Sequence, residues 1–115
     1  MNMKLNRLSN SLLKQISYIL ATEIKDKNIQ FVTVTDVKLS SDLSYAKVYV
    51  TVLEDDKREE ILKSLNNARG FIRTKLADYI EIRHLPELTF VYDESIEYGM
   101  KIEKIINELH KDEKK

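Results

Sequence analysis

An interruption in the helical pattern of residues 57–79 constrains the fold of this chain more than any other feature. Apolar side chains recur there at helical spacing, at Ile61, Leu65, Ile72, Leu76 and Tyr79. In an unbroken helix, however, Arg69 would lie beside this apolar stripe and Phe71 would project to the solvated side. Gly70, which costs a helix interior about 1 kcal/mol relative to alanine, lies between them. We therefore predict a kink or break at residues 68–70 that rotates the second half of the helix.

Two strand patterns precede the interrupted segment. Residues 31–39 are rich in valine and threonine, and residues 45–53 alternate cleanly between apolar and polar side chains. In the first pattern the apolar positions change parity between Val34 and Val37, which predicts a bulge or the end of pairing near Asp36. A short link with turn residues joins the two patterns, so we expect an antiparallel hairpin.

One helix precedes these strands, and a strand and a helix follow the interrupted segment. Residues 5–27 predict an amphipathic helix, whose apolar stripe contains Leu5, Leu8, Leu12, Ile16 and Ile19. Residues 88–92 alternate as a third strand, which should run parallel to the second because a helical crossover precedes it. Asp93 is a good N-cap for the last helix. The inner face of that helix is predicted to contain Tyr98, Ile102, Ile105, Ile106 and Leu109.

The order of these elements predicts a small α+β domain. It runs helix, strand, strand, helix, kinked helix, strand, helix, and helices on one side of a three-stranded mixed sheet would bury every apolar face. A chain of 115 residues suits one hydrophobic core, so we expect a single domain over residues 1–110 and a short polar tail at 111–115. The first six elements follow the order of a type II KH domain, a module for single-stranded RNA.

Composition excludes several classes of function. No stretch approaches the roughly 20 apolar residues that cross a bilayer, and the chain has no cysteine for disulfides, thiolate metal sites or nucleophilic catalysis. His84 and His110 lack partners at the spacing of metal ligands. Asp93, Glu94 and Glu97 are close enough for paired acids, but helix capping explains them. We expect no catalytic centre, no metal, no cofactor, no small-molecule substrate and no membrane contact.

The charge is unevenly distributed although the net charge is zero. Residues 1–27 contain five basic and two acidic side chains, and residues 56–75 contain six basic and three acidic ones, so each segment has a net charge of +3. Residues 87–108 contain two basic and six acidic side chains, a net charge of −4. We predict one basic and one acidic side.

Gly70 and the basic residues around it form the candidate binding site. The stretch 66–73 lies where the KH module has its glycine loop, and a residue without a side chain lets the amides of the following helix approach a phosphate. The predicted RNA-binding residues are Ala68, Arg69, Gly70, Arg73, Lys75, Lys63, Arg7 and Lys14. On composition alone a solvated helix face explains the basic cluster about as well, and for Arg7 and Lys14 that explanation is at least as good.

Three stretches together resemble one known family. The sequence has Ala68-Arg69-Gly70 at the interruption, Ala46-Lys47-Val48-Tyr49-Val50 in the second strand, and a Pro-Glu-Leu, aromatic strand and Asp-x-Ser-Ile helix start over residues 85–96. In this pattern the chain resembles the ribosome-binding factor A family of bacterial maturation factors. That family is similar to type II KH domains but has a kinked Ala-x-Gly instead of the double-glycine loop.

The resemblance implies a function that periodicity and charge cannot supply. It implies binding to ribosomal RNA of the immature 30S subunit, help with late assembly and with processing near the 3′ end, release before translation, a cytoplasmic location and a role in cold adaptation. We expect a monomer. Two other classes stay open: a protein-interaction module of similar fold without RNA binding, and a small α+β hydrolase, for which the sequence offers no convincing nucleophile or base.

Overall fold

The computed structural model describes residues 3–29 and 31–95, and the predicted order of elements is confirmed as far as the third strand. The predicted last helix, with its inner face of Tyr98, Ile102, Ile105, Ile106 and Leu109, and the polar tail at 111–115 lie outside the described residues. Two single turns of 3₁₀ helix, at Lys27–Ile29 and Asp55–Lys57, were not predicted. In chain order the elements are α1 (Met3–Thr22), η1 (Lys27–Ile29), β1 (Val32–Leu39), β2 (Tyr45–Val52), η2 (Asp55–Lys57), α2 (Arg58–Asn67), α3 (Arg69–Leu76) and β3 (Glu87–Tyr92).

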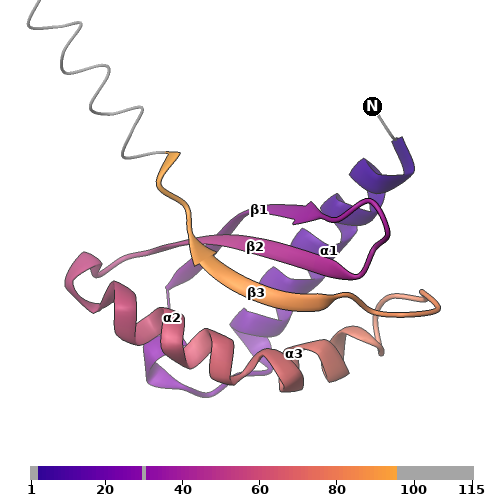
Figure 1. Ribbon diagram of the computed structural model, residues 1–115. Helices are drawn as coiled ribbons and strands as arrows, with labels where there is room; N and C mark the ends of the chain where they lie inside the picture. The colour runs from indigo at the N-terminus through magenta and orange to yellow at the C-terminus, as the bar shows by residue number, and fades with distance from the viewer. Residues whose placement is uncertain (1–2, 30, 96–115) are drawn as a thin grey trace, which may run out of the picture.

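The three strands form one mixed sheet in the order β1-β2-β3 (Figure 1). β1 pairs antiparallel to β2 and β2 pairs parallel to β3, as predicted. The register shifts between Val34 and Asp36, so Thr35 is the extra residue of a bulge. Because of this bulge, Val34 and Val37 both reach the core although their spacing breaks the alternation of a regular strand.

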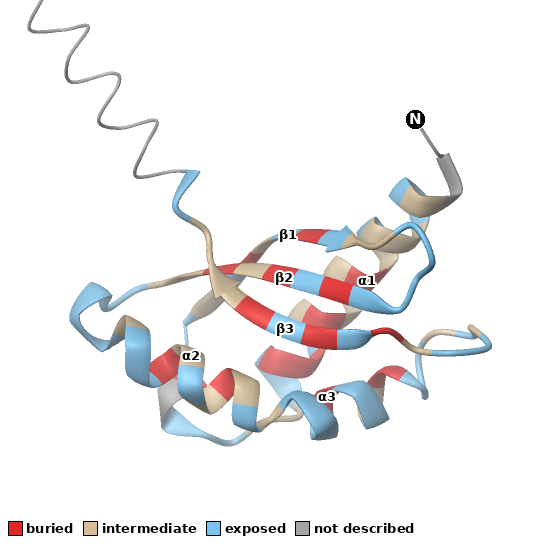
Figure 2. Cartoon of the chain, in the orientation of Figure 1, coloured by how far each residue is buried: buried red, intermediate tan, exposed pale blue. Residues whose placement is uncertain are grey.

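The helices cover one side of the sheet and the core lies between them (Figure 2). Strand residues alternate between buried and exposed positions, and the helices bury one stripe each. This arrangement confirms the predicted α+β architecture with helices on one side. The largest fully buried side chains are Leu12, Ile16, Ile19, Leu65, Ile72, Leu76, Val48, Val50 and Pro86.

The long helical segment is broken as predicted. α2 ends at Asn67, Ala68 has φ −88° and ψ −1°, and α3 begins at Arg69. The break does not turn Phe71 inward, however, because Ile72 continues the buried stripe and Phe71 stays 46% exposed. α3 ends at Leu76, so Tyr79 lies beyond the helix, is 41% exposed and does not join the buried stripe.

Asp93 joins the end of β3 to the bulge in β1. Its Oδ1 accepts a hydrogen bond from the Ser95 amide at 2.9 Å, the contact expected of an N-cap, and the Thr35 hydroxyl donates to its Oδ2. The Ser95 and Thr35 hydrogen bonds lower the pKa of Asp93 below its usual value. A carboxyl with a lowered pKa stabilises the folded state above its unfolded pKa of about 3.9, and that contribution is lost as the pH falls further.

Asp93→Asn should therefore remove part of the acid sensitivity of folding. Wild type and variant should differ in free energy of unfolding at about pH 6, and the difference should shrink as the pH falls below about 3.9 and Asp93 takes up a proton. Urea unfolding at a series of pH values measures this. The exposed Asp78 supplies a control for the loss of one negative charge, because Asp78→Asn should change the free energy of unfolding by no more than about 0.5 kcal/mol at pH 6. A constant difference for Asp93→Asn across this range would contradict the assignment.

Candidate nucleic-acid interface

The junction between α2 and α3 presents open backbone at Gly70. The Ala68 amide donates to the carbonyls of Ser64 and Leu65 and so ends α2, and the Ile72 amide donates to the Ala68 carbonyl inside the new helix. Gly70 is exposed, its φ is not positive, and a Cβ atom added there would meet no heavy atom within 4 Å. Neither backbone conformation nor packing therefore requires glycine at this position.

Gly70 also belongs to the first turn of α3, which has physical consequences. The amides of the first turn have no acceptor within their own helix, and the helix dipole places partial positive charge there. No acidic side chain occupies the first turn of α3. An anion can approach the bare main chain at this point.

Asn66 fixes the junction to the edge of the sheet. Its Nδ2 donates to the Phe90 carbonyl at 3.1 Å, and its Oδ1 accepts from the Phe90 amide at 2.9 Å. β3 is an edge strand among the described residues, so the Asn66 amide makes the two bonds that a neighbouring strand would make. The sequence interpretation included Asn66 in the candidate stretch without giving it a role. An amide at the end of a helix, just before a break, was the available signal.

Arg73 and Lys75 lie on opposite flanks of α3. Arg73 donates from Nε at 3.3 Å and from Nη2 at 2.7 Å to the Leu85 carbonyl, on the side of β3. Lys75 Nζ lies 3.7 Å from a carboxylate oxygen of Glu23, at the end of α1. Residues two apart in a helix differ by about 200° around the axis, so the predicted groove containing both cations is divided by α3 itself.

The other predicted RNA-binding residues also come from separate parts of the fold. Lys63 is exposed on α2, away from the buried Ile61 of that helix. Arg7 and Lys14 are exposed on α1. Arg7 belongs to the N-terminal part of α1, which Figure 1 shows far from the junction of α2 and α3. At a rise of 1.5 Å per residue, Arg7 and Glu23 are about 24 Å apart along the helix axis. We use the name junction surface for the predicted residues on α2, at the break and on the Arg73 flank of α3, which are Lys63, Ala68, Arg69, Gly70 and Arg73.

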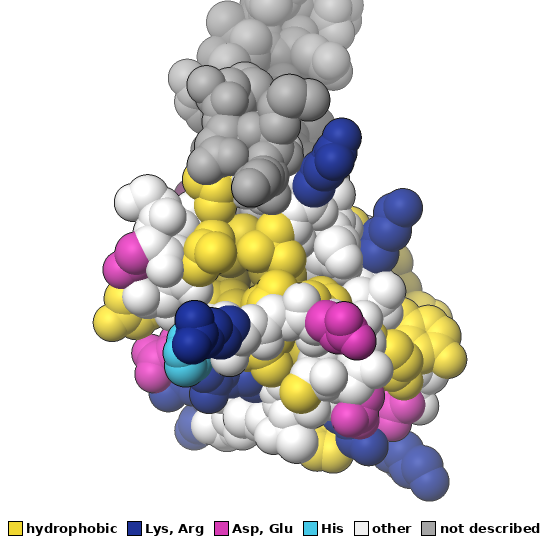
Figure 3. Space-filling model, turned by 90° about the vertical axis from the view of Figure 1, so that its right-hand side faces the viewer, with side chains coloured by type: hydrophobic (Ala, Val, Ile, Leu, Met, Phe, Trp, Pro, Cys, Tyr) yellow, Lys and Arg dark blue, Asp and Glu magenta, His cyan; other side chains and the backbone are white. Residues whose placement is uncertain are grey.

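A cleft of about 480 Å³ lies beside Arg73, between the β1–β2 turn and the segment that precedes β3. Arg83 and His84 line it together with Arg73, and Figure 3 shows Lys and Arg side chains gathered next to a histidine on this face. The sequence interpretation did not include Arg83, because nothing in its local pattern indicates that the chain brings it next to Arg73. Tyr45, Asp42 and Glu87 also line the cleft, so its charge is mixed.

Within residues 3–29 and 31–95, no group of three His, Cys, Asp or Glu side chains is placed to hold a metal ion. In the same residues, no helix combines the length and the apolar character needed to span a membrane.

The fold and the junction define a class: a small α+β domain of type II KH-like arrangement, with a short helix break and an open glycine in place of a glycine loop. The profile of the family described as Ribosome-binding factor A matches residues 4–106. The chain belongs to the ribosome-binding factor A family, which confirms the resemblance seen in the sequence and is not a known class of enzymes.

Relatives match over nearly the whole chain. Ribosome-binding factor A of Staphylococcus epidermidis is 47% identical over 114 residues, which cover 98% of each chain. The protein of the same name from Staphylococcus saprophyticus is 46% identical over 112 residues, which cover 96% of this chain and 98% of its own.

Solved structures show the same fold. The crystal structure of ribosome-binding factor A from Thermus thermophilus aligns with a TM-score of 0.73 at 26% identity, covering 79% of this chain and 97% of that one. The solution structure of a Thermotoga maritima protein described as a putative ribosome binding factor A gives a TM-score of 0.71 at 32% identity, covering 83% and 93%. A homology model of the Thermus thermophilus protein, fitted into a cryo-electron microscopy map of a complex of 30S with ribosome-binding factor A, gives a TM-score of 0.61 at 26% identity, covering 83% of this chain and 97% of that one.

Proposed function

We propose that this chain binds ribosomal RNA of the immature small subunit through the junction surface and assists late assembly of that subunit. The observation that carries the proposal is Gly70, which is exposed, has open space where a side chain would be, and lies in the first turn of a helix. The Thermus thermophilus relative in complex with 30S supports the small subunit as the partner. This role would be carried out by a monomer in the cytoplasm and would include RNA processing near the 3′ end and growth at low temperature.

The junction surface offers groups that can contact phosphates, and the proposed recognition does not depend on the base sequence of the RNA. Backbone N–H groups at the start of α3 would donate hydrogen bonds to a phosphate oxygen, and Arg69 and Lys63 would add positive charge from exposed positions. Arg73 uses two N–H groups on the Leu85 carbonyl, which leaves its other donors and its charge for the RNA. Recognition of this kind follows the shape and backbone of the RNA.

No reaction is required for such a factor to act. A protein that binds one RNA conformation more tightly than another shifts the equilibrium by the difference between the two binding free energies. We propose that the chain favours a late conformation of the small-subunit RNA in this way.

Binding should weaken steeply as salt increases, because each phosphate contact releases counterions. Arg69→Ala should reduce the slope of log K against log salt by about 0.7–0.9, the effect of one lost phosphate contact. Arg7→Ala is the matched control, since Arg7 lies far from the junction. Filter binding or fluorescence anisotropy over a salt series measures both slopes. An equal reduction for Arg7→Ala would extend the RNA contact to α1, and no change for Arg69→Ala would exclude the junction surface.

Crosslinking in cells, followed by sequencing of the attached RNA, tests the function itself. Recovery of small-subunit RNA near its 3′ end is the expected result. Binding to small-subunit proteins that survives complete removal of RNA would instead favour the protein-interaction module. Enrichment of unrelated RNA would overturn the ribosomal role.

A further inference from the structure

Three exposed aromatic side chains are linked through Lys75 and Glu23 on the flank of α3 that lies away from Arg73. Tyr18 is 51% exposed, Phe71 46% and Tyr79 41%. The rings of Tyr18 and Tyr79 meet edge to face, with centroids 5.7 Å apart and an angle of 75° between the planes. The ammonium group of Lys75 lies 5.6 Å from the centroid of the Phe71 ring. We call Tyr18, Phe71, Lys75 and Tyr79 the aromatic platform.

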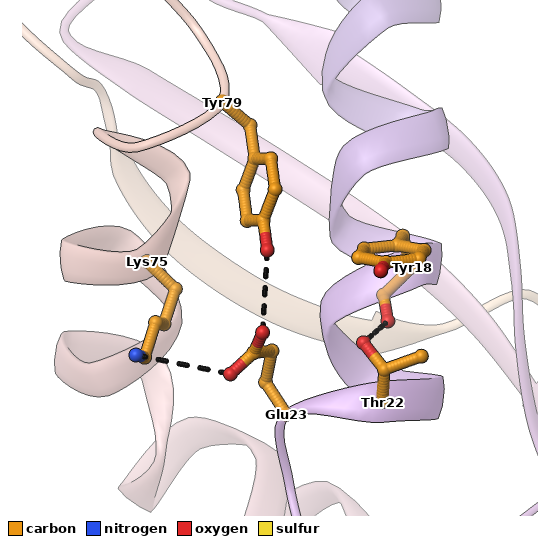
Figure 4. A network of polar contacts seen from close by, with 5 residues as sticks. All are labelled: Tyr18, Thr22, Glu23, Lys75 and Tyr79. Carbon is orange, nitrogen blue, oxygen red and sulfur yellow. Dashed lines mark hydrogen bonds and ion pairs between the residues drawn. The ribbon is translucent and has the colours of Figure 1, made fainter.

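A polar network joins Tyr79 to Lys75 through Glu23, as Figure 4 shows. The Tyr79 hydroxyl donates to one oxygen of the Glu23 carboxylate at 3.2 Å, and the Lys75 ammonium lies 3.7 Å from the other oxygen. Glu23 thus fixes the Tyr79 ring and the Lys75 charge before any partner arrives. Desolvation and the Glu23 hydrogen bond raise the pKa of Tyr79, so its hydroxyl stays neutral and adds no negative charge.

The chemistry of the platform fits unpaired nucleotides. Proteins hold unpaired RNA bases by stacking them on aromatic rings, and this contact tolerates any base because every base has a π-face. Phe71 and Lys75 are four residues apart, which places them about 5–6 Å from each other on one helix face. A single RNA strand presents bases and phosphates in alternation, matching ring, cation, ring along the platform.

The position of the platform favours RNA over a protein partner. Phe71 follows Gly70 directly in the chain, so the platform continues the junction surface around α3. The partly exposed ammonium group of Lys75 lies 5.6 Å from the Phe71 centroid and 3.7 Å from the Glu23 carboxylate. Its remaining N–H groups can donate to a phosphate, whereas an apolar protein surface would have to desolvate the whole ion pair.

We propose that the aromatic platform stacks unpaired bases of the same RNA strand whose phosphates contact the junction surface. The inference rests on the proposed function, since it needs RNA at the junction. Phe71 receives one base, Tyr79 with Tyr18 behind it receives another, and Lys75 contacts the phosphate between them.

Abasic RNA tests this proposal. Wild type and a Phe71→Leu, Tyr79→Leu double variant would be titrated against a short unstructured RNA and against the same RNA with abasic nucleotides, which keeps every phosphate. Wild type should bind the intact RNA at least about tenfold more tightly than the abasic RNA. The double variant should bind both with the affinity of wild type for the abasic RNA. Its slope against salt should stay that of wild type, because leucine removes a ring and no charge.

Two controls keep the result interpretable. Tyr79→Phe keeps the ring and loses only the contact with Glu23, so its preference for intact RNA should persist. Tyr49→Leu removes a partly exposed tyrosine on β2, whose ring lies against Lys38 outside the platform and the junction surface, and should also keep the preference. Thermal unfolding of each variant checks that the fold is intact.

The outcomes separate this inference from the function on which it rests. If wild type binds no RNA at any salt concentration, the proposed function fails. If wild type binds with a steep salt dependence but does not distinguish intact from abasic RNA, or the double variant keeps the preference, only the platform proposal is overturned. Unchanged RNA binding by the double variant, together with loss of binding to RNA-free subunit proteins, would overturn it in favour of a protein contact.

Discussion

Gly70→Asp should weaken binding to immature small subunits by about 100-fold or more, equivalent to about 2.7 kcal/mol, without unfolding the chain. The new side chain has room, because nothing lies within 4 Å of the added Cβ. A carboxylate in the first turn of α3 is favoured by the helix dipole, which offsets any cost to folding. The same carboxylate would accept hydrogen bonds from the backbone N–H groups that are proposed to bind phosphate, and its negative charge would repel the RNA. Co-sedimentation with subunits measures the loss, and urea unfolding measures stability.

Two matched variants decide whether the loss is local. Ser41→Asp adds the same charge at an exposed position in the β1–β2 turn and should bind nearly as wild type. Gly70→Ala adds only a methyl group; it should raise the free energy of unfolding by up to about 1 kcal/mol and weaken binding modestly, because the methyl separates main chain from phosphate. Normal co-sedimentation of Gly70→Asp, or an equal loss for Ser41→Asp, would contradict the proposed interface.

The local pattern of the sequence was sufficient to predict the break in the helix. An apolar stripe passes through Ile72, while a charged Arg69 beside that stripe and a glycine in mid-helix both disagree with a continuous helix. The bulge at Thr35 was predictable for the same reason, since two valines that must both be buried stand at a spacing that a regular strand cannot provide. In each case the residues that must be buried do not fit the repeat of a regular helix or strand, and an interruption of the helix or strand removes the conflict.

The partners of the cations could not be predicted, because they come from distant parts of the chain. Arg73 bonds to Leu85 and Lys75 pairs with Glu23, and the sequence gives no measure of which flank of α3 faces which neighbour. Periodicity identifies the buried face of a helix and leaves its two flanks equivalent. The predicted groove therefore combined side chains that the fold separates.

The position of Tyr79 depended on how α3 ends. The amides of Asp78 and Tyr79 donate to the carbonyls of Lys75 and Leu76, each at 3.0 Å and each three residues back. Such 3₁₀-type bonds tighten the turn, so the direction of the side chain departs from that of an α-helical continuation. A helical period extended to residue 79 placed Tyr79 in the core, whereas the tightened turn places it beside Tyr18.

Asn66→Ala should lower the free energy of unfolding by about 2–3 kcal/mol, a large share of the 5–15 kcal/mol typical of a domain. The substitution removes both bonds to the backbone of Phe90 and leaves a partly buried amide and carbonyl without protein partners, at about 1–3 kcal/mol for each such group when fully buried. Asn67→Ala, at the exposed neighbouring position, should cost less than about 0.5 kcal/mol. Urea unfolding of both variants tests the difference, and equal losses would show that Asn66 does not fix the junction.

Asn66→Asp tests the same contact through its hydrogen-bonding pattern, because aspartate has the shape of asparagine. The carboxylate can still accept from the Phe90 amide, but it faces the Phe90 carbonyl with an oxygen where the wild type has an N–H donor. Repulsion there raises the pKa of the introduced carboxyl in the folded state, so its protonated form is stabilising at low pH and that contribution disappears as the pH rises. Relative to wild type, Asn66→Asp should therefore be least stable at neutral pH and should recover stability towards about pH 4. A loss that does not change with pH would mean that the amide acts only by filling space, and the junction would then be held by the packing of Leu65 and Ile72 alone.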